Sequence, residues 1–430
     1  MDSRACFYLI TVISLVTLCS SQCLTDKDDM QKLVPSARLN LYKGQQAFSV
    51  ALLDAINRAT PNENVFFSPY STYHALLLAY FGAKNQTENE LKKALNLEWA
   101  DNKYHVMQAY RYENQMRAKR AKQQDVDFRS VDKIFVSKEA ELKECMKNIF
   151  FDELETLDFV NEAEKCRQDI NHWVEEVTNN EIKDILNEGD ITPDTNLVLA
   201  NAAYFKGMWE SQFDSDLTEQ KVFFSAPDEQ SLVDMMTQKG TFNLGKNTFN
   251  INLLSHVKLS HTLFSGINEH LGTHVLELPY NGSEISMVIL LPPFESMRLE
   301  HVLNRLTPES LSQALNEGMP REIEVELPKF AFEQTIELTP ELFLSSSDLS
   351  NFSEKKTLSL GDARHKAKIK VDEEGSTAAA ATVLFTFRSA RPVEPTKFIC
   401  NHPFLFLIFD HKSDAILFAG IYRKPEKSTY

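Results

Sequence analysis

Residues 372–395 constrain the fold of this chain more than any other segment. Acidic residues and Gly375 lead into small residues, four of them consecutive alanines, followed by β-branched and aromatic residues, with no proline before Pro392. Alanine favours helix, but a short isolated helix of this kind is marginal in water. A strand at the centre of a sheet needs small side chains on its buried face and no proline. The small residues that recur at period two are Ser376, Ala378, Ala380 and Thr382. The segment therefore predicts an exposed loop that can become a central strand.

The rest of the chain has a helix-rich first half and a strand-rich second half. Apolar residues recur at helical spacing over residues 47–56 and again over 166–177. Thr87 and Glu90 have the pattern of a capping box at the start of another helix. Beyond about residue 195, runs of β-branched and aromatic residues indicate strands. No linker rich in proline, glycine or serine separates the halves, so we predict a single α+β domain over residues 22–430.

The first 21 residues have the three parts of a secretory signal peptide. Arg4 lies in a short polar start, an apolar run covers residues 5–18, and the small residues Ser20 and Ser21 follow. We expect residues 1–21 to be removed and the protein to be secreted into the extracellular space. No later segment reaches the roughly 18 consecutive apolar residues of a membrane span. With 61 acidic against 45 basic residues and a formal charge of -16, the chain is not expected to bind nucleic acid or a membrane.

Cysteine and asparagine patterns fit an exported protein. Cleavage after residue 21 leaves Cys23, Cys145, Cys166 and Cys400, without a CxxC pair or zinc-ligand spacing. Disulfides are therefore permitted but not required, and no metal site is predicted. Three Asn-x-Ser/Thr triplets are candidate glycosylation sites. They begin at Asn85, Asn281 and Asn351.

Motifs of catalysis are missing from the sequence. It contains no HExxH helix, GxSxG turn, GxGxxG turn or Walker loop, and its 61 carboxylates form no recognisable acid/base pattern. We therefore expect a protein that is not an enzyme. A secreted hydrolase remains an alternative, but it would need a nucleophile for which the sequence offers no candidate.

Six blocks of sequence, in order, carry a resemblance to a known family. They are NVFFSPYS at 64–71, NAAYFKGMWE at 201–210, HVLELPYNG at 274–282, LPKF at 327–330, VDEEGSTAAAAT at 371–382 and FICNHPFLFLI at 398–408. The chain resembles the serpins, serine protease inhibitors of the conformational-trap type, and is most similar to secreted insect haemolymph serpins that restrain protease cascades of innate immunity.

The resemblance implies a fold and a mechanism. It implies three β-sheets with eight or nine helices, and a reactive-centre loop at about 375–395 that is exposed as bait. A target protease attacks this loop, forms an acyl-enzyme through its own serine, and is trapped when the cleaved loop inserts into the main sheet. The expected partner is an extracellular serine protease, with a trypsin-like enzyme favoured over an elastase-like one, and the inhibitor itself is expected to be a monomer. A non-inhibitory carrier or storage serpin is the alternative within the family, although the small hinge residue Ser376 favours inhibition.

The resemblance also assigns site residues. The hinge comprises Glu373, Glu374, Gly375, Ser376, Thr377, Ala378, Ala379, Ala380, Ala381 and Thr382, with Glu373 facing Lys329 in an ion pair. A cluster that controls opening of the sheet comprises Ser68, Ser71, Asn201 and His365, with Trp209 near the point where the loop enters. These residues are expected to gate motion and not to react.

Two positions of the cleaved bond stay open. Family spacing counted from Gly375 gives Ser389 and the bond to Ala390, which suits an elastase-like protease. The residue before it, Arg388, suits the buried carboxylate of a trypsin-like pocket, which we favour. Arg388 also begins an RxxR pattern of the kind that furin-like proteases cut, but the proline that follows is expected to hinder cleavage there.

A cluster of basic residues lies on one predicted helix of this acidic protein. Spacing of three places Arg117 with Arg120 on one helix face and Lys119 with Lys122 on the adjacent face. The cluster comprises Arg111, Arg117, Lys119, Arg120 and Lys122. By resemblance, this helix is a candidate site for a heparin-like sulfated polysaccharide acting as an activator, with a solvated charged face as the alternative. No other cofactor is expected.

Three departures from the family pattern bear on inhibitory competence. Between Phe242 and Val275 the chain is roughly twenty residues longer than the hairpin needs, with the excess near 246–265. Near 340–343 roughly eight residues of an expected short helix are missing. Lys368 stands where an apolar strand residue is expected.

Overall fold

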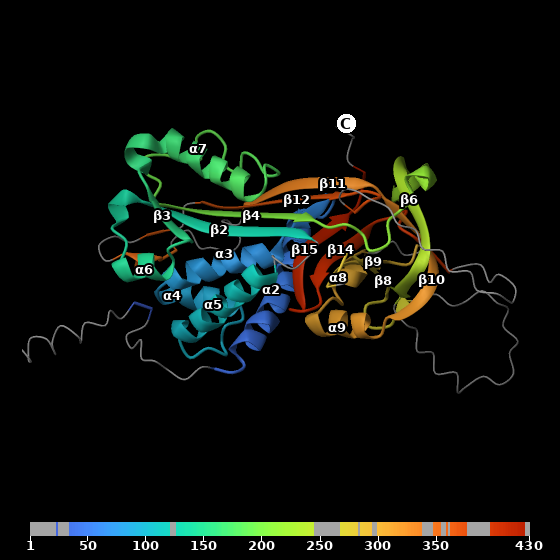
Figure 1. Ribbon diagram of the computed structural model, residues 1–430, viewed down its shortest axis with the longest axis horizontal. Helices are drawn as coiled ribbons and strands as arrows, with labels where there is room; N and C mark the ends of the chain where they lie inside the picture. The colour runs from blue at the N-terminus through green and yellow to red at the C-terminus, as the bar shows by residue number, and fades with distance from the viewer. Residues whose placement is uncertain are drawn as a thin grey trace, which may run out of the picture.

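The computed structural model describes residues 23–24, 34–120, 126–244, 267–282, 284–294, 299–337, 347–353, 358–359, 362–375 and 396–425. Within these ranges the chain forms eight α-helices and fifteen strands, which confirms the predicted α+β class (Figure 1). The helices are α2 (Ala37–Ala59), α3 (Pro69–Gly82), α4 (Asn85–Ala94), α5 (Lys103–Arg120), α6 (Glu144–Ile149), α7 (Phe159–Val177), α8 (Leu299–Leu303) and α9 (Pro308–Asn316).

Helix starts follow local capping chemistry, with one difference from the sequence prediction. At α3, the Ser68 side chain accepts a hydrogen bond from the Ser71 N–H, as expected of an N-cap residue. The predicted capping box at Thr87 is wrong, because α4 begins at Asn85 with Lys84 as its N-cap, three residues before the predicted cap. The Thr87 hydroxyl instead accepts a hydrogen bond from the Asp348 N–H at 2.9 Å. Tertiary contact thus replaces a local cap there.

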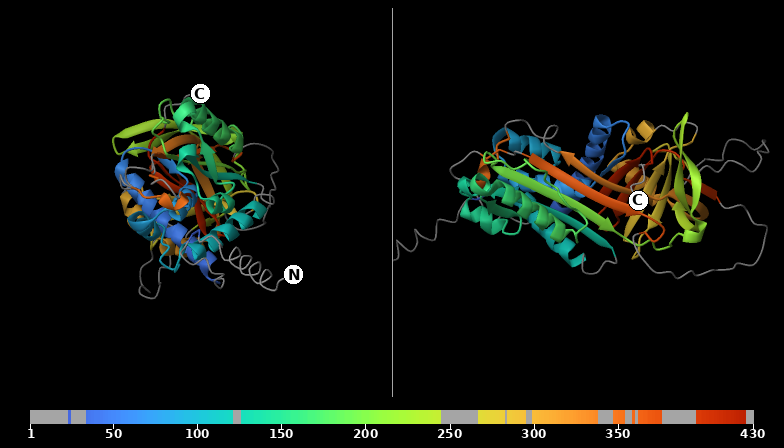
Figure 2. Two further views of the ribbon diagram at one scale, coloured as in Figure 1. Left: turned by 90° about the vertical axis from the view of Figure 1, so that its left-hand side faces the viewer. Right: turned by 90° about the horizontal axis from the view of Figure 1, so that it is seen from above.

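A five-stranded sheet forms one half of the molecule. Its strand order is β11 (Phe330–Glu337), β12 (Asp362–Val371), β4 (Leu197–Lys206), β2 (Asp127–Ser137) and β3 (Leu154–Leu157). The pairs β12/β4 and β2/β3 are parallel and the other two pairs are antiparallel. Helix α7 lies across one face of this sheet and α3 packs against the other (Figures 1 and 2). Strand β4 is therefore buried on both faces, as its burial along nine of ten residues shows.

The remaining strands form one ten-stranded hydrogen-bonded network. Its main path is β1 (Val65–Phe67), β15 (Ala415–Tyr422), β14 (Phe404–Asp410), β9 (Ile285–Leu291), β8 (Thr273–Pro279), β6 (Glu229–Leu244), β10 (Met319–Pro328) and β13 (Thr396–Ile399). Strands β5 (Glu219–Ala226) and β7 (Ile267–Asn268) pair with β6 and β8. Within the described residues, β6 pairs with β8 through Asn243 with Glu277 and Leu244 with Leu276, where the described part of β6 ends. Divided between β6 and β8, the network gives two sheets, and the five-stranded sheet is the third.

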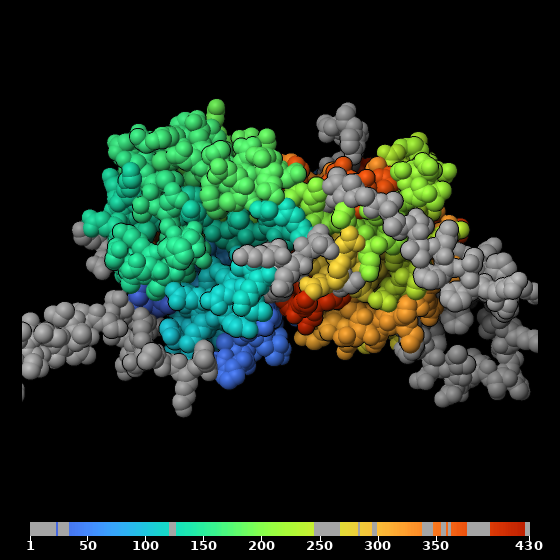
Figure 3. Space-filling model, viewed as in Figure 1, coloured from blue at the N-terminus to red at the C-terminus, as the bar shows by residue number. Residues whose placement is uncertain are grey.

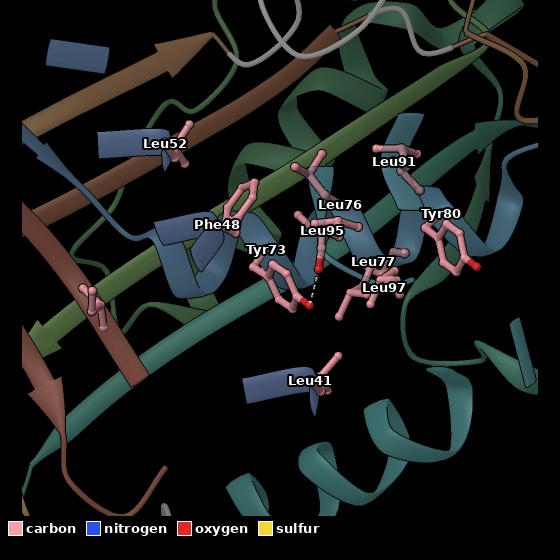
Figure 4. Close-up of a cluster of buried hydrophobic side chains, with 14 of the residues drawn as sticks. Leu41, Phe48, Leu52, Tyr73, Leu76, Leu77, Tyr80, Leu91, Leu95 and Leu97 are labelled. Carbon is pink, nitrogen blue, oxygen red and sulfur yellow. Dashed lines mark hydrogen bonds between the residues drawn. The ribbon is translucent and has the colours of Figure 1, made fainter. Parts of the chain in front are cut away.

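Two kinds of packing hold these layers together. Beneath the five-stranded sheet, apolar side chains of α2, α3 and α4 form a core in which the Tyr73 hydroxyl donates to the Leu95 carbonyl at 3.0 Å (Figure 4). Between the sheets, the ring of Phe66 stacks on those of Phe332 and Phe418, with centroids 6.3 and 5.3 Å apart. These rings couple β11 of the five-stranded sheet to β15 of the larger network.

A disulfide joins Cys23 to Cys145, residues 122 apart in sequence, with their Cα atoms 6.0 Å apart. It ties the start of the described chain to α6. Cys166 and Cys400 are buried free thiols. Among the described helices, none combines the length and apolar character needed to cross a membrane.

Candidate functional site

The seam between β4 and β12 is the centre of the candidate site. The two strands pair in parallel over seven residue pairs, from Asp362 with Val198 to Lys368 with Tyr204. Strand β12 continues for three more residues, to Val371, and stays paired with β11 there. The seam therefore ends before β12 does, and the two strands separate toward the end that carries residue 372.

The predicted sheet-opening residues meet beneath this seam. Ser68, Ser71, Asn201 and His365 each have 0% exposed surface. The Ser68 backbone N–H donates to His365 Nε2 at 2.8 Å, and the other ring nitrogen, Nδ1, contacts Asn201 Oδ1. A backbone N–H can only donate, so Nε2 is unprotonated and the neutral ring donates through Nδ1 to Asn201. Burial lowers the pKa of His365 to about 3, which keeps the ring neutral at physiological pH.

These contacts also exclude the cluster as a hydrolytic centre. The Ser68 hydroxyl donates to the Leu417 carbonyl at 2.7 Å, while His365 receives the Ser68 backbone N–H and not the hydroxyl. A serine nucleophile needs its hydroxyl on the base and access to substrate. Neither condition holds at this buried pair, so the cluster connects strands and does not carry chemistry.

Sequence reasoning missed Asp132, which belongs to the same network. It lies on β2 directly opposite Asn201, whose amide Nδ2 donates to the Asp132 carboxyl and to Ser71 Oγ. Burial raises the pKa of Asp132 to about 7, although nearby Arg117 and the hydrogen bonds lower it. Its only sequence signal is an acidic residue in a strand that also carries Asp127 and Lys133, a pattern that by itself indicates a solvent-facing position.

At the open end of the seam, Trp209 fixes the chain that leaves β12. Its ring is 2% exposed and stacks on Tyr280, with centroids 4.5 Å apart. Trp209 Nε1 donates to the Asp372 carbonyl at 3.0 Å, and its backbone N–H donates to the Glu374 carbonyl at 3.2 Å. Trp209, predicted to lie where the loop enters, therefore holds the first part of the hinge through both side chain and backbone.

The predicted ion pair of the hinge is present. Lys329 Nζ lies 2.8 Å from Glu373 Oε2, and the Thr218 hydroxyl donates to the same carboxylate at 2.7 Å. Burial raises the pKa of Glu373, but these two donors outweigh it and the pKa is lowered overall. The carboxylate is therefore charged and held at the mouth of the seam.

The chain reverses direction at the hinge. Asp372 and Gly375 form an antiparallel bridge, and Gly375 has φ +95°. A Cβ atom at Gly375 would lie 2.5 Å from the Gly207 carbonyl oxygen, just past the end of β4. Gly375 thus sits between the ends of β4 and β12, where positive φ and close approach both require glycine.

The bait itself lies outside the described residues. These stop at Gly375 on the five-stranded sheet and resume at Thr396, where β13 pairs with β10 of the other network. The undescribed stretch includes Arg388, Ser389, Ala390 and the hinge from Ser376 to Thr382, so their roles stay predictions. The long stretch near 246–265 and the short one near 340–343 are also outside the described residues.

Lys368 lies on the outer face of β12, which accounts for a lysine where an apolar strand residue was expected. Its ammonium lies 3.0 Å from Glu181, in the segment that follows α7. On the same face Arg364 binds Asp190 at 2.8 Å. The lysine therefore points outward, into ion pairs with the segment that follows α7, and not into the core. In the space-filling view, α7 and the residues after it cover the upper side of this sheet (Figure 3).

The basic residues predicted on α5 do not form one exposed surface. Arg117 is the residue for which the predicted exposure is wrong. Arg111 and Lys119 are exposed, but Arg117 is only partly exposed and its Nη1 atom is buried. Helical spacing gave the relative faces but not which face turns toward the core. The side chain of Arg120 and all of Lys122 are outside the described residues.

The three glycosylation candidates differ in how exposed they are in the structure. Asn85 is exposed and Asn281 is partly exposed in the turn with Gly282. Asn351 is 7% exposed, and its Nδ2 donates to the Phe81 carbonyl at 3.0 Å. Asn351 as an acceptor is therefore wrong in this fold, because its amide nitrogen is buried and bonded. The described residues contain no cluster of three or more potential metal ligands.

Comparisons with known proteins agree with this fold. A family model described as "Serpin (serine protease inhibitor)" matches residues 43–425, so the chain belongs to the serpin family. Among its relatives, "Serine protease inhibitor 88Ea" of Drosophila melanogaster is 49% identical over 412 residues, covering 90% of this chain and 92% of that protein. "Serpin B3" of Homo sapiens is 31% identical over 393 residues, covering 86% and 95%. The solved structure of uncleaved ovalbumin matches with a TM-score of 0.72 at 25% identity, covering 90% of this chain and 100% of that one.

Proposed function

We propose that the protein is a secreted suicide-substrate inhibitor of an extracellular serine protease, trypsin-like through Arg388 or elastase-like through Ser389. The observation that carries the proposal is the reversal at Asp372–Gly375, which starts an antiparallel return of the chain at the mouth of the β4/β12 seam. A chain that continued in this direction would enter between β4 and β12, which are hydrogen-bonded directly to each other along the seam.

The energy of such an insertion is sufficient for a trap. An inserted strand would break the parallel ladder of seven residue pairs between β4 and β12 and form two antiparallel ladders, one with each neighbour. The net gain is therefore at least one ladder of hydrogen bonds. At a net 0.5–1.5 kcal/mol per hydrogen bond, the gain is about 4–10 kcal/mol. This is comparable to the whole stability of a typical domain, roughly 5–15 kcal/mol.

Secretion is supported by the Cys23–Cys145 disulfide. Such bonds form and persist in oxidising compartments. Cys23 is also the first cysteine after the proposed signal peptide, 1–21, so the bridge survives cleavage of that peptide.

The decisive experiment mixes the purified protein with trypsin and with pancreatic elastase. We expect a covalent complex that survives detergent and heat, and a released peptide that starts at Ser389 with trypsin. A start at Ala390 would assign the bond to Ser389. Complete cleavage with the protease still active would overturn inhibition and leave a non-inhibitory serpin.

A matched pair of hinge variants tests insertion separately from recognition. Ala380→Glu places a charge on the face that must be buried, and Ala379→Glu places the same charge on the alternate face. We expect A380E to be cleaved without trapping the protease and A379E to retain the covalent complex. Equal trapping by both variants would show that this segment does not enter the sheet as a strand.

A further inference from the structure

A cavity lies away from the seam, on the other side of β2. Its volume is about 480 Å³, and it is lined by residues of α3, α5, the start of β2, the end of α7 and strands β9, β14 and β15. This is within the range of small-molecule sites, roughly 300–1,000 Å³. Its apolar lining comprises Val126, Phe128, Val131, Val177, Ile285 and Leu417.

Each of two polar side chains of α5 that line this cavity has one buried polar atom without a hydrogen-bond partner among the described residues. Arg117 and Asn114 are three residues apart and therefore share a helix face. Arg117 Nη1 and Asn114 Oδ1 are both buried, and within the described residues neither has a hydrogen-bond partner. A guanidinium is always charged, so an unpartnered N–H beside an apolar wall is costly unless an acceptor binds there.

The carboxylates closest to Arg117 already hold other donors. Glu113 accepts from the Tyr42 hydroxyl and, at 3.3 Å, from the Tyr70 hydroxyl. Asp132 accepts from Asn201 and Ser71 in the sheet-opening cluster. Both carboxylates contribute to the electrostatic field at Arg117, but neither is a dedicated partner of its Nη1 atom.

The acidic groups in the cavity wall are likewise engaged. Asp127 pairs with Arg129 at 2.7 Å. Asp410 accepts from the Lys412 N–H at 2.9 Å and from the Ser413 hydroxyl at 2.6 Å. The cavity wall thus contains carboxylates that already accept hydrogen bonds, a broad apolar surface, and Arg117, whose Nη1 atom has no acceptor in the part of the chain that the structure describes.

We propose that this cavity binds an apolar carboxylate, with its head group on Arg117 and its hydrocarbon body against Phe128, Val131 and Leu417. The planar fork of arginine matches a carboxylate, and a charge-assisted hydrogen bond of this kind is strong in a partly buried site. The described lining of the cavity includes neither the bait loop nor Ser68, Ser71, Asn201 or His365. Binding in the cavity can therefore be tested whether or not the protein inhibits a protease.

Dodecanoate is a suitable probe. It is titrated calorimetrically, below its micelle concentration, into the purified full-length protein, with methyl dodecanoate as the uncharged control. We expect saturable binding at one site, and binding at least tenfold weaker for the methyl ester. Absence of saturable binding of dodecanoate would overturn the proposal.

Substitutions in the cavity test whether dodecanoate binds there. Arg117→Gln removes the cation, and Arg111→Gln, on the same helix but exposed, is its matched control. We expect R117Q to bind at least tenfold more weakly and R111Q to bind unchanged. Val131→Phe fills the cavity and keeps Arg117, so it tests the site even if R117Q is poorly folded. We expect V131F to lose binding, and unchanged affinity in R117Q or V131F would overturn the assignment.

Discussion

Replacing Asp132 with asparagine is expected to stabilise the folded protein at alkaline pH. The folded-state pKa of Asp132 is about 7, against 3.8 for an ordinary aspartate, because burial disfavours its charged form. The folded state therefore holds a proton that the unfolded state releases, and stability falls as the pH rises from about 4 to 8. The asparagine of D132N cannot ionise, yet its side-chain oxygen can still accept the Asn201 amide.

The magnitude follows from the two pKa values of Asp132. A fully buried carboxyl with this shift would contribute about 4 kcal/mol between pH 4 and pH 8. The residue is only partly buried, so solvent screening reduces the expected gain for D132N to about 2 kcal/mol at pH 8.

The contribution of His365 to folding stability changes with pH in the opposite direction to that of Asp132. The two contributions can therefore be told apart by experiment. Its pKa is about 3 in the folded state, against 6.5 for an ordinary histidine, so its contribution is lost as the pH falls from 6.5 toward 3. In the wild type the slopes of Asp132 and His365 partly cancel. In D132N only the His365 slope remains, so acidification below pH 6.5 is expected to destabilise the variant more steeply.

Urea denaturation midpoints measured from pH 4.5 to pH 8 check this prediction. Asp127→Asn is the matched control, because Asp127 lies on the same strand but pairs with Arg129 near the surface. A D132N profile parallel to that of the wild type, or a loss of stability at pH 8, would refute the reasoning.

Three further changes have expected outcomes. Serine at both Cys23 and Cys145 opens a loop of 122 residues and is expected to lower the free energy of unfolding by up to about 5 kcal/mol from chain entropy, as measured by urea denaturation; an unchanged midpoint would contradict this. Gly375→Ala places a methyl group 2.5 Å from a backbone carbonyl at positive φ, so we expect a cost of about 1–3 kcal/mol and a lower melting temperature, and a wild-type melting curve would argue against a fixed hinge. Lys368→Ala removes a pair with Glu181 that is about one-third exposed, so we expect a loss below about 1 kcal/mol; a larger loss would mean that the segment after α7 depends on this contact.

The resemblance to the serpin family predicted several residues that the structure brings together at the β4/β12 seam. Asn201 and His365 were expected in one cluster, and the parallel register of β4 and β12 places them side by side. Gly375 and Trp209 were likewise predicted where the loop enters the sheet, and the backbone contacts between the two segments place them there. These positions were predicted from the resemblance to the serpins, whose motifs occur in the same order in this chain.

Other features depend on three-dimensional packing and were not predictable. Four cysteines allow six different single disulfides, so spacing alone does not select Cys23 with Cys145. A glycosylation triplet contains no information on burial, and Asn351 is inside the fold. Arg117 illustrates the same limit for helices, because a helical repeat fixes relative faces and leaves the inward direction to neighbouring elements.

The parallel pairing of β4 and β12 has a consequence for how often such a molecule acts. A strand that runs opposite to both neighbours would be held by hydrogen bonds on its two edges. Withdrawal of that strand would require both rows of bonds to break together, so the change is expected to be irreversible on a biological timescale. Each copy would then serve a single encounter, and the quantity of the protein made, rather than its turnover, would set how much protease is removed.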